Sequence, residues 1–445
     1  MKIWDKGFSI DKRIEEFTIG RDRELDVWLA SFDILGSMAH SRMLHKIGLL
    51  EKDELTQLLG GLKEIYQQVE AGEFEIEEGI EDVHSQVELM LTRKLGDIGK
   101  KVHSGRSRND QVLLDLRLYI RHEIKTMVDL SHQLFNTLTS LSEQYKTVLM
   151  PGYTHTQVAM PSSFGLWFGA YAESLVDDMI LMQAAFKISN QNPLGSAAGY
   201  GSSFPLDRTL TTQLLGFETM SYNVVYAQMG RGKVEKTVSF ALASLAATLS
   251  KMAADVCLYM SQNFGFISLP DKLTTGSSIM PHKKNPDVFE LMRAKSNKLQ
   301  ALPNEIAMIV GNLTSGYHRD LQLVKESFLP AIEDLKNCLS IADYMLKHVQ
   351  VNNNILKDEK YKYLFSVEAV NEEVLQGTPF RDAYKKVGAQ IADGSYQITR
   401  DLNHSHEGSL GNLCNDKIEE KMHKIIEQFS FQPIEESLFR LLRDS

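Results

Sequence analysis

The chain has 445 residues, of which 43% are hydrophobic and 24% charged, and its formal net charge is −10. The length suggests about three domains with a large buried core, and the composition is that of an ordinary soluble globular protein. The acidic balance argues against nonspecific binding to nucleic acid or to anionic membranes, so an anionic substrate would need cations placed locally around it.

The three cysteines, Cys257, Cys338 and Cys414, are far apart in the sequence and form no CxxC pair. This usage is typical of a reducing compartment and predicts neither a disulfide framework nor a structural zinc site. The first residues are charged and lack the apolar segment of a signal peptide, and the longest uncharged run contains prolines, so we expect no membrane span. A cytoplasmic protein is the expectation that follows.

Residues up to about 110 show short helical patterns separated by polar joints, which predicts a helical N-terminal domain over residues 1–110. Its last segment, residues 100–110, carries four formal positive charges. Asn109 or Asp110 can cap the helix that follows, and backbone N–H groups at that helix start, next to Arg108, would suit a carboxylate. The alternative is an exposed basic turn.

The middle of the chain contains long apolar-periodic runs, each about 35–50 Å long as a helix. They cover residues 112–145, 161–188, 233–263, 287–310 and 321–347. The third run has no charged residue from Thr237 to Ser250, and a helix that is apolar on every side must be surrounded by other helices. The pattern predicts a helical bundle domain over residues 111–350 and a small helical domain over 351–445, and its apolar surface favours oligomerisation.

Residues 275–287 have the composition of a mobile loop that runs into a helix. Gly276 and two serines leave the backbone few steric limits, while two lysines add positive charge. Asn285 is the expected N-cap of the following helix, with Pro286 at its first position. Such a segment suits an anionic substrate that must be enclosed, and the alternative is a surface loop with a solvated charge pair.

The polar joint at residues 151–157 contains His155, an acid/base candidate near neutral pH. Glu290, one turn into the helix after the loop, would raise the basicity of His155 if the two side chains met. The alternative is a structural histidine that only forms hydrogen bonds.

The segment that opens the last long run begins at Tyr317. Gln322 and Lys325 are three residues apart and share a helix face, although a solvated helix start would look the same. Strand signals are few along the chain, and a brief extended piece is expected near residues 203–204.

Several separated motifs resemble one enzyme superfamily. One of them, over residues 276–285, reads GSSIMPHKKN and closely resembles the signature of the fumarase/aspartase superfamily. Another, over residues 103–112, reads HSGRSRNDQV and is similar to the argininosuccinate lyase branch, because fumarases and aspartases carry a threonine-rich element there. Residues 317–326 and 379–383 resemble the same branch, so the resemblance covers nearly the whole chain.

The resemblance implies cleavage of argininosuccinate to L-arginine and fumarate, a step of arginine biosynthesis. It also implies a mainly all-α, three-domain fold whose central long-helix bundle forms the core of a homotetramer. In this family the active sites are assembled from loops of three subunits. No metal and no organic cofactor is expected, and the expected partners are the small-molecule substrate and other copies of the chain.

Residue by residue, Ser277 matches the general base of the family, and Lys283 and Asn285 match the groups that hold the dianionic aci-carboxylate formed after proton removal. His155 matches a histidine that was once assigned as the base in this family and is otherwise thought to assist proton transfer, and Glu290 matches its partner. The positions that match substrate-binding residues of the family are Asn109, Ser107, Arg108, Thr154, Asn285, Tyr317, Gln322, Lys325 and Thr18.

Departures from the family pattern occur at residues 4–7, 192–203 and 229–232, and they leave the roles of Thr18 and Arg231 open. One alternative is a sister lyase that releases fumarate from adenylosuccinate or a related adduct. The element at residues 106–109 is the feature that discriminates between such a lyase and the argininosuccinate lyase branch. Another is a non-catalytic, crystallin-like scaffold, which the intact set of chemical residues disfavours.

Overall fold

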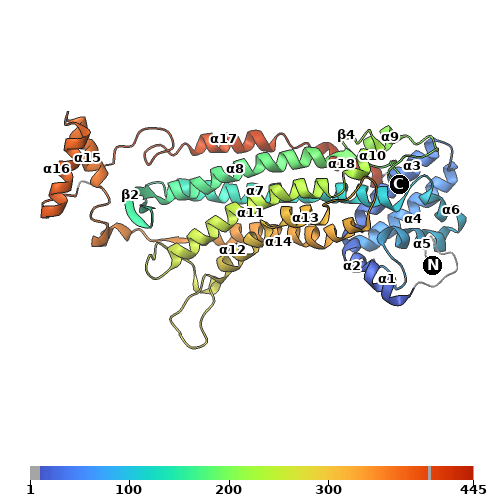
Figure 1. The fold of residues 1–445 in the computed structure, drawn as a ribbon, viewed down its shortest axis with the longest axis horizontal. Coiled ribbons are helices and arrows are strands. Elements are labelled where there is room, and N and C mark those ends of the chain that lie inside the picture. Colours follow the sequence, from blue (N-terminus) through green and yellow to red (C-terminus); the bar gives the residue numbers. More distant parts are fainter. Residues whose placement is uncertain (1–10, 399–401, 444–445) are drawn as a thin grey trace.

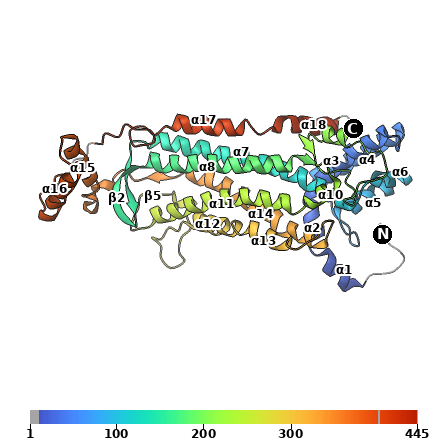
Figure 2. The ribbon, with the colours of Figure 1, turned by 45° about the horizontal axis from the view of Figure 1, so that its top comes forward.

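The computed structural model describes residues 11–398 and 402–443, so the departure at residues 4–7 lies outside the described residues. The molecule is an elongated bundle of long helices (Figure 1). Short helices α1–α6 gather at one end of the bundle, and α15 and α16 project beyond the other end, as Figure 2 also shows. The mainly α-helical fold that the sequence predicts is therefore confirmed.

The end of the bundle that carries the N-terminal segment is built from short and medium helices. They are α1 (Lys12–Ile19), α2 (Asp22–Asp26), α3 (Ala30–Lys46), α4 (Lys52–Glu70), α5 (Val83–Leu95) and α6 (Asp97–Lys100). Helix α3 packs against α4 and the long helix α7 (Arg108–Gln144), and a separate apolar cluster fills the space between these helices. This packing fixes the start of α7 against the N-terminal helices.

The long helices form the main core. Besides α7 they are α8 (Phe164–Ser189), α11 (Lys233–Met260), α12 (Asp287–Leu299), α13 (Leu302–Ile309) and α14 (Leu323–Leu346). Helix α7 packs against α8 and α14, and α11 packs against α8, α12, α13 and α14. At 1.5 Å per residue the 37 residues of α7 span about 55 Å, so its two ends belong to different regions of the molecule.

Helix α11 is the one described helix that is long and apolar enough to cross a membrane by length and composition. It runs through the middle of the bundle, where Leu242, Leu245 and Leu249 are fully buried. Packing against four other helices accounts for its apolar character. Its burial within a single chain is incomplete, however, because Phe240 is 58% exposed.

Three details of the helices differ from the sequence-based expectations. Ser107 rather than Asn109 or Asp110 is the N-cap of α7, since Ser107 and Asp110 form a reciprocal capping box. The run at residues 287–310 is two helices rather than one, because α13 begins next to Pro303, which has no N–H to continue the ladder. Pro286, without a side-chain cap, precedes α12, so the predicted N-cap at Asn285 is wrong.

The predicted polar joint between the first two long helices is an antiparallel hairpin. It pairs β1 (Leu149–Thr154) with β2 (Gln157–Ser163), and its turn consists of His155 and Thr156, whose φ values are 51° and 60°. The left-handed backbone at both turn residues is that of a tight hairpin turn. No strand forms at residues 203–204, where the expectation of an extended piece is wrong.

The remaining elements are short or peripheral. The strands are β3 (Gln191–Asn192), β4 (Thr219–Met220), β5 (Ile267–Ser268) and β6 (Gln350–Val351), with β3 parallel to β4 and β5 antiparallel to β6. The other α-helices are α9 (Arg208–Leu214), α10 (Val224–Met229), α15 (Ser366–Leu375), α16 (Phe380–Asp393), α17 (Asn415–Ile426) and α18 (Phe431–Arg443). The 3₁₀ helices are η1 (Val27–Leu29), η2 (Lys101–His103), η3 (Asp271–Leu273), η4 (Arg319–Gln322), η5 (Ile355–Lys357) and η6 (Glu359–Tyr361).

The C-terminal part of the chain divides between two places. Helices α15 and α16 pack on each other around Val370, Ala383 and Val387. Helix α17 runs back along α8 and α7, and α18 ends against α3 and α9 (Figure 1). The domain boundaries near residues 110 and 350 stay a prediction.

Candidate active site

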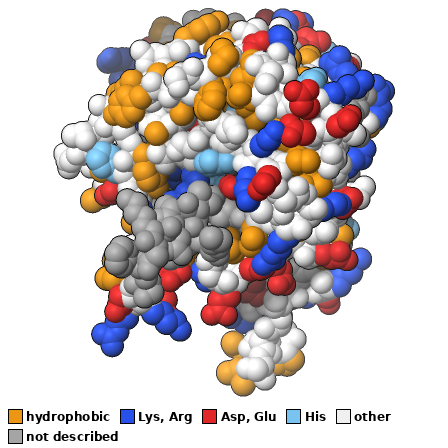
Figure 3. All heavy atoms as spheres, turned by 90° about the vertical axis from the view of Figure 1, so that its right-hand side faces the viewer, with side chains coloured by type: hydrophobic (Ala, Val, Ile, Leu, Met, Phe, Trp, Pro, Cys, Tyr) orange, Lys and Arg blue, Asp and Glu red, His pale blue; other side chains and the backbone are white. Residues whose placement is uncertain are grey.

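A charged pocket lies where the N-terminal helices meet the start of α7. Residues of α2, the start of α5, the start of α7, the turn before α11 and the segment 317–325 line it. Figure 3 looks at this end of the molecule, where basic and acidic side chains are intermingled across the surface. Four carboxylates and four Arg and Lys side chains line the pocket together with His84, and this mixture suits a ligand that itself carries both signs of charge.

Lys325 is the most deeply buried cation of the pocket. Its side chain is 4% exposed, and its Nζ lies 2.8 Å from Asp22 Oδ1 and forms a second ion pair with Asp26. Burial lowers the pKa of Lys325, but the neighbouring carboxylates of Asp26 and Asp22 outweigh that effect and raise it, so the ammonium stays charged. Burial raises the pKa of Asp22 to about 6 against the pull of Lys325.

Arg108, at the first position of α7, is held by two acids. It lies 2.6 Å from Asp82 Oδ2 and 3.0 Å from Glu81 Oε2, and Arg319 pairs with the other oxygen of Glu81. These ion pairs fasten α7 to the segment before α5 and to η4. Arg108 therefore shapes the wall of the pocket with a charge that is already balanced.

Gln322 connects the pocket to the N-terminal helices. Its Nε2 donates to the carbonyl oxygens of Thr18 at 3.0 Å and Ile19 at 2.9 Å. The hydroxyl of Thr18 instead donates to Ile14 O at 2.8 Å within its own helix. Thr18 thus meets Gln322 through its backbone, and its side chain does not line the pocket.

The other predicted binding residues divide between lining the pocket and shaping it. Asn109 and Tyr317 line the pocket together with Gln322 and Lys325, and their role in binding substrate stays a prediction. The hydroxyl of Ser107 instead caps α7, because its Oγ accepts a hydrogen bond from the Asn109 N–H at 3.2 Å.

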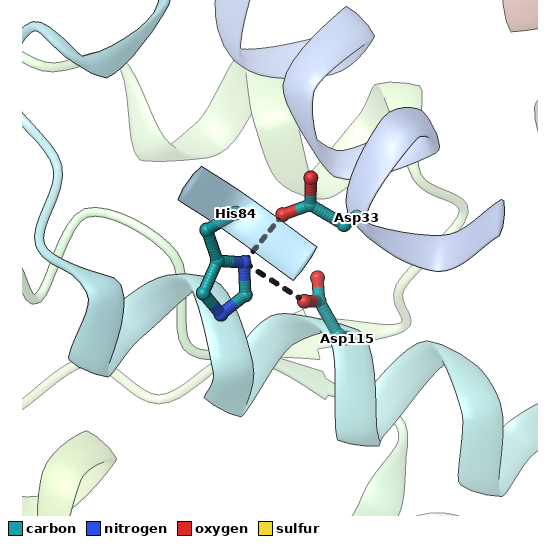
Figure 4. A group of neighbouring side chains, drawn as sticks. All are labelled: Asp33, His84 and Asp115. Atoms are coloured by element: carbon teal, nitrogen blue, oxygen red, sulfur yellow. Dashed lines mark hydrogen bonds and ion pairs between the residues drawn. The ribbon is translucent and has the colours of Figure 1, made fainter. Parts of the chain in front are cut away.

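A buried histidine cluster supports the pocket from behind. His84 Nδ1 lies 2.7 Å from Asp33 Oδ1 and 3.5 Å from Asp115 Oδ2, and the three side chains come from α5, α3 and α7 (Figure 4). Burial alone would lower the pKa of His84, but the carboxylate of Asp33 and then that of Asp115 raise it to about 9. The imidazole is therefore a cation at neutral pH, and His84 lines the pocket.

This cluster has the residue types of a metal site, since three ligand atoms lie within 4.8 Å of one another. Its geometry is that of a hydrogen-bonded ion pair, because the Nδ1 that would bind a metal faces Asp33 at 2.7 Å. Burial raises the pKa of Asp115 well above its ordinary value, and the negative charge of the nearby Asp33 carboxylate raises it further. The arrangement is a charge-balanced junction of three helices.

The proposed proton-transfer residues lie at the opposite end of α7. His155 and Thr154 are exposed at the tip of the β1–β2 hairpin, which begins just beyond the C-terminus of α7. Tyr153, one residue pair from the turn, packs against Phe264 and Phe266 and holds the hairpin there. Since Asn109 is near the N-terminus of α7, about 55 Å of helix separates it from His155.

Ser277 lies on the long loop between α11 and α12, which extends from the side of the bundle (Figure 1). The neck of the loop is closed where Asn285 N donates to Thr275 O at 2.9 Å, and the Asn285 amide lies 3.4 Å from Gly276 O. Ser277 Oγ accepts from the backbone N–H groups of Ile279 at 3.3 Å and Met280 at 3.1 Å. Two amide donors on one hydroxyl oxygen stabilise negative charge there.

The two lysines of this loop have different surroundings. Lys284 pairs with Asp271, whereas Lys283 is exposed and forms no ion pair with any described residue. Glu290 is exposed on α12, and no hydrogen bond or ion pair joins it to His155 within the described parts of the chain. Within one chain the loop and the hairpin thus lie apart from the pocket that holds Asn109.

Several pocket residues escaped the sequence analysis. Asp22, Asp26, Glu81 and Asp82 contribute the acidic half of the pocket. The adjacent acids before α5 could have been matched to the basic segment at residues 100–108 by charge complementarity. No local sequence pattern marked Asp22 and Asp26 of α2 as pocket residues, because their partner Lys325 lies 299 residues away from Asp26 in sequence.

Comparison with known proteins gives consistent matches. A family model described as a lyase matches residues 3–300. The chain is 64% identical over 441 residues to a protein named argininosuccinate lyase from Bacteroides fragilis, and the match covers 99% of each chain. It is equally similar, at 64% over 441 residues, to a protein of that name from Phocaeicola vulgatus, again over 99% of each chain.

A solved structure of EDDS lyase in complex with formate superposes with a TM-score of 0.81 at 19% identity, covering 98% of this chain and 96% of that chain. At this level of identity the likeness shows the fold.

Proposed function

This chain belongs to the argininosuccinate lyase family and is a carbon–nitrogen lyase, and we propose that it cleaves argininosuccinate to L-arginine and fumarate. The observation that carries the proposal is the joint presence of two elements on one helical chain. One is the amide-cradled Ser277 on its loop, and the other is the charged pocket around Lys325.

The reaction starts with removal of a proton from the carbon next to a succinyl carboxylate. Ser277, as the alkoxide, accepts this proton, and the electron pair moves into the carboxylate to form the dianionic aci-carboxylate. Lys283 and Asn285 hold the extra negative charge, which is the largest single requirement of such a step. Collapse of the dianion expels the guanidine nitrogen and leaves the carbon–carbon double bond of fumarate.

His155 assists the transfer of protons to and from the site, with Thr154 beside it at the hairpin tip. Glu290 orients the imidazole and raises its basicity. Because the imidazole is exposed at the end of a hairpin rather than buried in its own chain, these contacts are made to other copies of the chain.

We infer that the working form is a homotetramer whose active sites are shared between subunits. The large apolar side chains left exposed along the bundle support this inference. They are Ile180 (51%), Leu181 (46%), Phe240 (58%), Leu291 (63%) and Met308 (76%). Exposed apolar side chains on four neighbouring long helices are typical of a surface that another copy covers.

In this assembly the pocket of one subunit binds the substrate. The hairpin and the loop of other subunits supply the catalytic residues His155, Ser277 and Lys283. Asn109, Tyr317, Gln322 and Lys325 bind the substrate directly. Arg108 and Ser107 order the start of α7, whose N–H groups and positive dipole end favour a carboxylate. The protein works in the cytoplasm, in keeping with its three free cysteines.

A side-by-side substrate assay tests this proposal. The purified protein is incubated with argininosuccinate and, separately, with adenylosuccinate, and the absorbance of fumarate is followed. We expect fumarate from argininosuccinate and none from adenylosuccinate. Turnover of adenylosuccinate alone, or a folded protein that releases no fumarate from either adduct, would overturn the proposal.

A further inference from the structure

The loop at residues 195–206, which we call the strap, is fastened to the buried carboxylate that caps α7. Asp110 Oδ1 accepts a hydrogen bond from the Ser107 N–H at 2.8 Å. Its other oxygen, Oδ2, accepts from the N–H groups of Gly195 at 3.1 Å and Ala197 at 2.9 Å. Asp110 is fully buried, so these hydrogen bonds are shielded from water. The strap and the start of α7, which lines the pocket, therefore share one anchor.

The strap is held in a costly backbone conformation. Ala197 has a φ of +50°, in the left-handed region that disfavours a residue with a side chain. Ser196 O accepts hydrogen bonds from the N–H groups of Gly199 at 2.9 Å and Gly201 at 3.0 Å. Backbone strain of this kind persists only where surrounding contacts over-determine it, and it clusters at functional sites. The strap is therefore a rigid loop rather than a flexible connector.

The second half of the strap lies against the segment that leads into α7. A Cβ at Gly105 would lie 3.0 Å from Leu206 Cδ2 and 3.5 Å from Phe204 Cδ2. This close approach leaves no room for a larger side chain at residue 105. The strap thus contacts the α7 side of the pocket at both of its ends.

Between these two ends the strap presents Tyr200 to a different wall of the pocket. The Tyr200 hydroxyl lies 3.4 Å from the position that a Cβ of Gly316 would occupy, and Gly316 has a φ of +103°. The next residue, Tyr317, lines the pocket. Tyr200 is 70% exposed, so packing in the core does not account for this contact. Through Tyr200, the strap connects the α7 side of the pocket with the loop that carries Tyr317.

The loop that carries Tyr317 buries little of itself. It joins α13 to η4, and its residues Asn312 and Ser315 are exposed. A segment with few buried side chains opens at a low cost in free energy. The Arg231 guanidinium carbon lies 5.5 Å from the centre of the Tyr317 ring and limits the movement of the side chain. The contact of Tyr200 with the preceding residue limits the movement of the backbone.

From these contacts we propose that Tyr200 is a positioning residue for substrate binding, which braces the backbone at Gly316 and thereby keeps Tyr317 on the pocket wall. Tyr200 acts through Tyr317 and does not itself line the pocket. Without this brace the loop also populates conformations in which Tyr317 is withdrawn, and the apparent affinity for substrate falls with the fraction of competent molecules. The inference rests on the proposed function, in which Tyr317 binds the substrate. Tyr200 lies in the segment 192–203, where the sequence departs from the family pattern, so the resemblance assigns it no role.

Hydrogen exchange tests the brace in the intact oligomer without any substrate. In Tyr200→Ala the backbone amides of residues 311–318 should exchange at least about threefold faster than in the wild type, because local opening costs less free energy. Tyr200→Phe keeps most of the ring and should change the exchange less. The matched control is Tyr222→Ala, which removes a side chain that is 76% exposed and should leave this loop unchanged. Wild-type exchange in Tyr200→Ala, an equal increase in the control, or faster exchange throughout the chain would overturn the proposal.

Steady-state kinetics with argininosuccinate test the consequence for binding. Tyr200→Ala should raise KM about three- to tenfold and leave kcat within about twofold, because saturating substrate restores the competent conformation. Tyr200→Phe should recover part of the loss, and Tyr222→Ala should keep the KM of the wild type. An unchanged KM in Tyr200→Ala, or a loss confined to kcat, would contradict a positioning role.

A double-mutant cycle shows whether Tyr200 acts through Tyr317. In a Tyr317→Ala background, adding Tyr200→Ala should raise KM by less than about twofold, because the side chain that it positions is already missing. An equal rise in both backgrounds would overturn the proposal. Failure of the brace and failure of the proposed function are distinguishable. A wild type that releases fumarate from argininosuccinate and is matched by Tyr200→Ala contradicts only the brace, whereas a wild type that releases none contradicts the function.

Discussion

His84 Nδ1 lies 2.7 Å from Asp33 Oδ1, and both side chains are buried behind the charged pocket. The contact joins α5 to α3, and Asp115 of α7 lies 3.5 Å from the same nitrogen. One protonated imidazole therefore holds together three helices, of which α5 and α7 carry pocket residues. The stability of this end of the molecule depends on that proton.

The first prediction concerns pH. The folded-state pKa of His84 is about 9, above its ordinary value of 6.5. Because the pKa is raised, the ion pair of His84 with Asp33 contributes its full share to the free energy of unfolding below about pH 6.5. That contribution is lost as the pH rises through about 9. We expect the midpoint of urea unfolding to fall over this range.

His84→Gln should remove this pH dependence and should lower stability at pH 6 by about 3–5 kcal/mol, because it leaves buried carboxylates without their cation. The matched control is His423→Gln, since His423 is 74% exposed and pairs with Glu427 on the surface of α17. A variant that keeps the wild-type fall between these pH values would show that another group causes it.

The second prediction separates two neighbouring serines. Ser277→Ala removes the hydroxyl that accepts from Ile279 and Met280, and it should lower fumarate release by at least about 10³-fold without changing the fold. Ser278→Ala, one residue further along the same exposed loop, should keep near-normal activity. Equal losses in the two variants would mean that the loop acts through its conformation and that Ser277 is not the base.

The third prediction uses the two lysines of the loop. Lys283→Met should lower kcat by about 10²–10³-fold, because its ammonium stabilises charge that develops during the reaction. Lys284→Met removes a side chain already paired with Asp271 and should change kcat only slightly. Steady-state kinetics check both variants, and a larger loss for Lys284→Met would reverse the assignment.

The fourth prediction tests the turn before α11. Gly265→Ala places a side chain at φ +57° in open space and should cost about 1 kcal/mol of backbone strain. Gly232→Ala adds a clash with Val310 at a similar φ and should cost about 1–3 kcal/mol more. Chemical unfolding measures both losses. If the two variants lose equal stability, the close approach of Val310 does not constrain the turn.

Much of the architecture followed from sequence periodicity. The long runs ended within a few residues of α7, α8, α11 and α14, because apolar side chains recur along one face of each helix. The division at α13 was missed, because the apolar pattern continues across Pro303. The hairpin at residues 149–163 was missed too, because its turn is made by His155 and Thr156 rather than by glycine.

The pocket was only half predictable. Asn109, Gln322 and Lys325 lie in recognisable local sequence patterns. Asp22 and Arg231 became identifiable as pocket residues only in the folded chain, where α2 and the turn before α11 line the same pocket. Charge complementarity between segments hundreds of residues apart leaves no periodic trace in a single sequence. The separation of Ser277 from Asn109 also needed the helix lengths in three dimensions.

The most direct test of the account is complementation between two inactive variants. Ser277→Ala lacks the base at one end of the chain, and Asn109→Ala lacks a binding residue at the other. Mixed after joint unfolding and refolding at equal amounts, the two should regain about a quarter of wild-type fumarate release. In about one shared site in four, an Asn109→Ala chain supplies the intact Ser277 and a Ser277→Ala chain supplies the intact Asn109. Each variant refolded alone should stay inactive. A mixture no more active than its components would show that one chain supplies both residues to a site, and would contradict the account.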